Sequence, residues 1–97
     1  MAFGLPDKLM REIDAVAVVH GIDRVTLFGS RARGDFRETS DIDLAVTGGD
    51  IAGFAVDIEE DTDTLLKFDV VNLDGTVRDD LRRSIEREGR IIHEKVR

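Results

Sequence analysis

Apolar residues recur along the chain at two periods, one helical and one alternating. The helical period joins Leu9, Ile13 and Val16, which lie between Pro6 and Gly21. Proline is tolerated at the start of a helix and glycine commonly ends one. This spacing therefore predicts a first helix with one buried face.

Strands are predicted where β-branched and aromatic residues gather in short runs bounded by turn-forming residues. Four segments have this character: 24–28, 41–47, 68–73 and 90–94. Between them the pattern predicts a helical turn over 31–35 and an amphipathic helix over 51–60. Helices that alternate with strands predict a small α/β domain, in which a mixed sheet is flanked by helices.

The last helix is expected to precede Gly89, with Asp74 or Thr76 as its N-terminal cap. Its expected buried stripe consists of Val77, Leu81 and Ile85.

Composition narrows the class of protein. The 97 residues predict a single domain over 1–97. Lys and Arg number 14 and Asp and Glu 21, so the net charge of −7 argues against a partner that is long nucleic acid. The chain has no cysteine, which excludes disulfides and thiolate metal sites. No apolar run has the length of a membrane span, and we expect a cytoplasmic protein with no membrane partner.

Two carboxylates, Asp41 and Asp43, lie two positions apart in a predicted strand whose alternate residues are apolar. They therefore point to the same face of the sheet, about 6.6 Å apart along the strand. Two like charges in this arrangement repel each other unless a cation lies between them. Mg²⁺ suits such a pair, and a two-metal site is one possibility. A solvated strand end is the other interpretation of this pattern.

Gly29-Ser30 ends the strand before this one and begins the predicted helical turn. Backbone N–H groups and a hydroxyl at such a junction suit a phosphate. Arg31, Arg33 and Arg37 follow at once, and arginine matches phosphate oxygens with two parallel hydrogen bonds. The same residues also fit an ordinary turn with surface charges.

The combination is more specific than its parts. Gly29-Ser30, ten residues and then Asp41-x-Asp43 form the signature of the nucleotidyltransferase superfamily that is related to the DNA polymerase β palm. Within it, the segment GSRARGDFRETSDIDLAV closely resembles the minimal nucleotidyltransferases (MNT proteins), which are encoded beside HEPN-domain partners. The resemblance extends through KFDVVNL and LRRSIEREGRIIHE.

This resemblance implies a palm-like core and assigns the site residues. Asp41, Asp43 and Asp69 are expected to be both catalytic and metal-binding, with Asp69 as the third carboxylate on a later strand. On sequence alone Asp69 is a polar residue in an apolar strand, which is costly unless it is paired or metal-bound. Its rivals for that role are Asp57, Asp61 and Asp63.

The same resemblance assigns nucleotide binding to Gly29, Ser30, Arg31 and Arg33, with Mg²⁺ as cofactor and ATP as substrate. It implies transfer of AMP to a hydroxyl group, a tyrosine hydroxyl on a HEPN-domain partner. The chain is then the antitoxin of a toxin–antitoxin pair and forms a hetero-oligomer. One alternative is a non-catalytic antitoxin or accessory subunit that neutralises its partner by binding. Another is a nucleotidyltransferase for small molecules of the antibiotic-modifying type.

Three further features are interpreted structurally. His20 is expected at the surface at a helix end, and His93 is expected to pack rather than to catalyse. The acidic run 59–61 predicts a solvated helix end, with a basic partner as the alternative.

Overall fold

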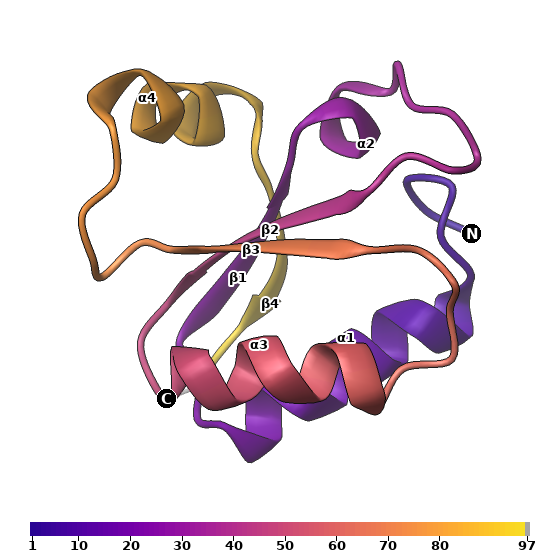
Figure 1. Cartoon of the computed structure of the whole chain (residues 1–97), viewed down its shortest axis with the longest axis horizontal. Coiled ribbons are helices and arrows are strands. Elements are labelled where there is room, and N and C mark those ends of the chain that lie inside the picture. Colours follow the sequence, from indigo (N-terminus) through magenta and orange to yellow (C-terminus); the bar gives the residue numbers. More distant parts are fainter. Residues whose placement is uncertain (97) are drawn as a thin grey trace.

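A four-stranded sheet forms the centre of the molecule, in the order β3-β2-β1-β4 (Figure 1). The computed structural model describes residues 1–96. The strands are β1 (Arg24–Phe28), β2 (Ile42–Thr47), β3 (Phe68–Asn72) and β4 (Arg90–Glu94). β1 is antiparallel to both of its neighbours, whereas β2 and β3 are parallel. The predicted mixed sheet is confirmed.

The helices lie on both sides of this sheet. They are α1 (Asp7–Val19), α2 (Ser30–Arg33), α3 (Ile51–Glu60) and α4 (Asp79–Glu88). α1 and α3 lie together on one side, and α2 and α4 lie on the other (Figure 1). Among residues 1–96, none of the helices is long and apolar enough to span a membrane.

Strand alternation separates a buried face of the sheet from a polar one. On β2, Ile42, Leu44 and Val46 are fully buried in the core cluster, to which α1 and α3 also contribute. Asp43 and Thr47, on the opposite face, are partly exposed. Because successive residues of a strand point to opposite faces, burial of the apolar set directs Asp43 to the side of α2 and α4.

The start of the last helix differs from the prediction. α4 begins at Asp79 after Arg78, and no side chain caps it. Asp74 instead accepts hydrogen bonds from the Thr47 hydroxyl and from the Gly48 N–H at 2.8 Å. Both donors lie at the end of β2, so Asp74 does not cap α4 but connects the loop after β3 with the loop after β2. Ile85 is the one buried residue of α4, and the expected three-residue stripe is therefore reduced.

His20 lies at the end of α1, as predicted, but it is not a surface residue there, whereas His93 is buried as expected. The His20 side chain is only 14% exposed, and its two ring nitrogens lie 2.7 Å from Asp57 Oδ2 and 3.3 Å from Asp50 Oδ2. His93 is buried, with Nδ1 2.6 Å from Asp14 Oδ1. Each histidine thus joins α1 to a distant segment. The acidic run 59–61 is exposed, as predicted.

Candidate active site

The candidate active site is a row of carboxylates on the polar face of the sheet. Asp43 on β2 is the register partner of Asp69 on the parallel strand β3. Asp41 lies two residues before Asp43 and is exposed, as is Asp69. Neighbouring strands are about 4.8 Å apart, so the two register partners lie side by side. The sheet therefore pairs Asp43 with Asp69, and Asp41 lies immediately before the start of β2, where its charge acts on Asp43.

The charge balance of this row is unfavourable for ionised carboxylates. Burial raises the pKa of Asp43 to about 6, and the charge of Asp69 and a hydrogen bond with it add to the rise. Asp41 contributes a smaller repulsion, and the positive charge of Arg33 opposes the shift. A cation between the carboxylates would relieve this repulsion.

Gly29 links the two halves of the sequence motif in space. Its backbone has φ 75° and ψ −155°, a conformation that is almost confined to glycine. A Cβ built on Gly29 would collide with the carboxylate of Asp43. The end of β1 can therefore approach Asp43 only because residue 29 has no side chain.

Ser30 and Arg33 lie on the single turn of α2 that follows. Ser30 is partly exposed at its first position, and the Arg33 side chain is 43% exposed at its last. Arg33 Nη1 donates to Glu88 Oε2 at 3.2 Å, and Nε donates to Asp35 Oδ2 at 3.3 Å. The guanidinium thus lies between two carboxylates, and its charge also acts on Asp43.

Arg31 lies in a different environment from Arg33. The residue is 1% exposed, and its guanidinium lies 4.9 Å from the centre of the Phe36 ring. Its nitrogens donate to four backbone carbonyl oxygens, those of Phe3, Arg37, Glu38 and Ser40. The pKa of Arg31 is lowered by burial. These contacts do not favour the predicted phosphate contact, because they direct Arg31 to the loop between α2 and β2.

The chemistry of the carboxylate row fits a hard divalent cation. All three side chains offer oxygen donors, and Asp43 and Asp69 repel each other. Among residues 1–96 no three acidic, histidine or cysteine side chains are already grouped as a metal site. Mg²⁺ commonly takes only one or two protein carboxylates and completes its shell with water and substrate phosphates. The residues present therefore fit Mg²⁺ with ligands shared between protein and nucleotide.

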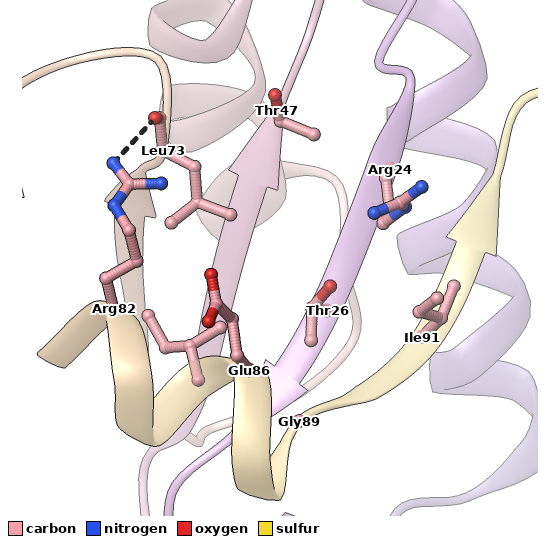
Figure 2. A pocket seen from close by; sticks show the side chains of 9 residues that line it. Arg24, Thr26, Thr47, Leu73, Arg82, Glu86, Gly89 and Ile91 are labelled. Atoms are coloured by element: carbon pink, nitrogen blue, oxygen red, sulfur yellow. Dashed lines mark hydrogen bonds between the residues drawn. The ribbon is translucent and has the colours of Figure 1, made fainter.

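A separate pocket of about 450 Å³ lies beneath α4 (Figure 2). Thr26 of β1 and Thr47 of β2 line its floor, and Glu86 of α4 points into it. Arg82 donates a hydrogen bond to the Leu73 carbonyl at 3.3 Å along its edge. None of the predicted site residues lines this pocket.

Sequence comparison assigns the chain to a family. The family described as Polymerase beta, Nucleotidyltransferase matches residues 11–97, and so includes the whole carboxylate row and Gly29-Ser30. The chain belongs to this nucleotidyltransferase family. The resemblance inferred from the Gly-Ser and Asp-x-Asp motif is thereby confirmed at the level of the nucleotidyltransferases.

Two proteins from Methanocaldococcus jannaschii are similar in sequence to part of this nucleotidyltransferase. "Putative protein adenylyltransferase MJ0435" is 41% identical over 44 residues, which cover 45% of this chain and 47% of that protein. "Putative protein adenylyltransferase MJ0604" is 44% identical over 50 residues, which cover 52% of this chain and 48% of that protein. The nucleotidyltransferase chain thus spans about half the length of these relatives.

The fold also matches a crystal structure of a toxin-antitoxin with AMP-PNP. The TM-score is 0.71 at 20% identity, and the match covers 89% of this chain and 73% of that one. At this identity the match shows the nucleotidyltransferase fold, which confirms the architecture predicted from the sequence.

One residue near the site was not singled out in the sequence. Glu88 lies 55 positions from Arg33 and meets it only because α4 returns toward α2. No local pattern marks Glu88, since a glutamate in the last turn of a charged helix is normally solvated.

Proposed function

We propose that this nucleotidyltransferase moves AMP from ATP onto a hydroxyl group of a partner protein and thereby acts as an antitoxin. The observation that carries the proposal is the pairing of Asp43 with Asp69 on adjacent strands, next to Gly29. Family membership and the names of the two archaeal relatives support the same reaction class.

In the proposed reaction the acceptor oxygen attacks the α-phosphorus of ATP. The bond from that phosphorus to the bridging oxygen of the β-phosphate breaks, and pyrophosphate leaves. The acceptor proton passes to Asp69 or to a water beside it. Asp41, Asp43 and Asp69 would hold Mg²⁺, which supplies charge neutralisation for the triphosphate. Positioning and electrostatics then supply most of the catalysis.

The triphosphate is assigned to the end of β1. Gly29 permits close approach of the backbone, and the Ser30 hydroxyl and Arg33 donate to the β- and γ-phosphates. We assign Arg31 to the support of this site, because its guanidinium already donates to four carbonyl oxygens.

The acceptor is proposed to be a tyrosine hydroxyl on a HEPN-type toxin, with which the chain forms a hetero-oligomer in the cytoplasm. The resemblance to the minimal nucleotidyltransferases suggests this partner. The toxin-antitoxin composition of the structural neighbour supports a toxin as the partner.

Intact-mass spectrometry tests the proposal. The complex of the chain with its proposed HEPN-type partner is incubated with ATP and Mg²⁺. We expect the partner to gain the mass of one or more AMP units, and Asp43→Asn to abolish the gain. A partner of unchanged mass in a stable complex would contradict transfer and favour an antitoxin that acts by binding. In that case Asp43→Asn would still neutralise the toxin in cells.

A further inference from the structure

The three nitrogens of the Arg33 guanidinium have different surroundings. Nε and Nη1 donate to Asp35 and Glu88, respectively. Nη2 has no hydrogen-bond partner among residues 1–96. The two carboxylates thus hold the planar group from two different sides, and Nη2 stays free to donate to an anion. A guanidinium held in this way loses less rotamer entropy when it binds a phosphate.

Glu88 is well placed to act as a fixed anchor. It is the last residue of α4, its side chain is 24% exposed, and its second oxygen lies 3.7 Å from Arg87 Nη2. The next residue, Gly89, donates its N–H to the Ile85 carbonyl at 2.8 Å, and a Cβ there would collide with that oxygen and with the Thr26 methyl. The backbone beside Glu88 is therefore tightly packed against the sheet.

Asp35 provides a weaker anchor than Glu88. It is 63% exposed and lies two residues from Arg33, just after Gly34, the C-cap of α2. α2 itself is a single turn, and the Arg33 side chain is almost half exposed. Without Glu88, only the exposed pair with Asp35 would restrain the guanidinium, and such exposed pairs contribute little.

From these contacts we propose that Glu88 is a positioning residue, which holds the Arg33 guanidinium against the carboxylate row so that Nη2 meets the triphosphate. The inference rests on the proposed function, because it assumes that a triphosphate binds beside Arg33. It assigns α4 a part in nucleotide binding through a residue that does not itself touch the nucleotide.

A double-mutant cycle tests this role through the Kd of AMP-PNP with Mg²⁺, measured by calorimetry on the full chain. We expect Glu88→Gln to weaken binding about fivefold to tenfold, and Arg33→Ala to weaken it at least as much. The double variant should bind no more weakly than Arg33→Ala alone, because Glu88 acts only through Arg33. If Glu88→Gln does not fold, Glu88→Asp replaces it, with a smaller loss expected.

Glu86→Gln is the matched control, since it makes the same change two residues earlier, where the side chain faces the other pocket (Figure 2). It should bind within twofold of the wild type. Unchanged or tighter binding by Glu88→Gln, or losses that multiply in the double variant, would overturn the positioning role. A wild type that binds AMP-PNP but transfers no AMP contradicts only the proposed function. A wild type that does not bind AMP-PNP overturns both.

Discussion

At the residue scale, Gly29 shows how a sequence motif becomes a geometric requirement. Its side-chain-free Cα lets the end of β1 lie against the Asp43 carboxylate. Gly34 also has positive φ, at 91°, but a Cβ there would meet no atom within 4 Å. Substitution of Gly34 would therefore cause backbone strain alone, whereas substitution of Gly29 would also displace the Asp43 side chain.

We expect Gly29→Ala to destabilise the fold by about 1–3 kcal/mol and to abolish AMP transfer, because it combines strain with displacement of Asp43. Gly34→Ala should cost about 1 kcal/mol and leave transfer largely intact. Urea unfolding and the partner's mass gain measure the two effects. Equal loss of transfer in both variants would show that strain alone, rather than contact with Asp43, limits residue 29.

At the element scale, Arg31 joins segments that carry no regular structure of their own. Its guanidinium connects the carbonyl of Phe3 with those of residues 37, 38 and 40, and so ties the N-terminal turn to the connection between α2 and β2. That connection leads directly into Asp41. The position of the first carboxylate thus depends on a buried cation ten residues before it.

Arg31→Lys should destabilise the protein by about 2–4 kcal/mol, because one ammonium cannot replace the planar set of donors and the carbonyls lose their partners. Arg37→Lys, an exposed change of the same kind, should stay within about 0.5 kcal/mol of the wild type. Thermal and urea unfolding give both values. A stable Arg31→Lys variant with weakened nucleotide binding would instead restore Arg31 to the phosphate site.

His20 connects the end of α1 with α3. A hydrogen bond with Asp57, and a second with Asp50, raise the pKa of His20 despite its desolvation. A raised pKa means that the folded state holds the proton more tightly than the unfolded state. The resulting stabilisation is complete below about pH 6.5 and is lost as the pH rises through the folded-state pKa.

Asp57→Asn should therefore lower the free energy of unfolding by about 1 kcal/mol at pH 6, and by less at pH 9. Glu60→Gln, an exposed change on the same helix, serves as the control for net charge and should show no such pH dependence. Urea unfolding at both pH values provides the comparison. A loss that is the same at pH 6 and pH 9 would assign the effect to packing.

These elements also show what the sequence can predict. Strand positions follow from alternation, and β2 and α3 lie where the apolar pattern placed them. Asp74 and His20 were misjudged because their partners lie 27 and 37 positions away. The same polar residue types form helix caps and long-range hydrogen bonds, so only the folded structure distinguishes the two roles.

On the scale of the whole molecule, the two faces of the sheet have different roles, one in stability and one in the candidate site. One face buries the core under α1 and α3, and the other faces α2 and α4 (Figure 1). The paired Asp43 and Asp69 lie on this second face. The motif spacing identified Asp41, Asp43 and Gly29, but their contact arises from strand pairing. Asp69 joins them through the parallel register of β2 and β3, which depends on the α3 crossover.

A cation that relieves repulsion across this row should stabilise the whole domain. At a concentration one hundred times its Kd, a ligand that binds only the folded state adds about 2.7 kcal/mol. For a domain of this size, that corresponds to a rise in Tm of about 10–20 °C. Mg²⁺ with ATP should produce such a rise, whereas ATP with EDTA should produce little. Asp41→Asn should lose most of the rise, and Glu38→Gln, an exposed change of equal charge, should keep it. Differential scanning fluorimetry measures these changes in Tm. Equal rises in the wild type and in Asp41→Asn would place the metal away from the carboxylate row.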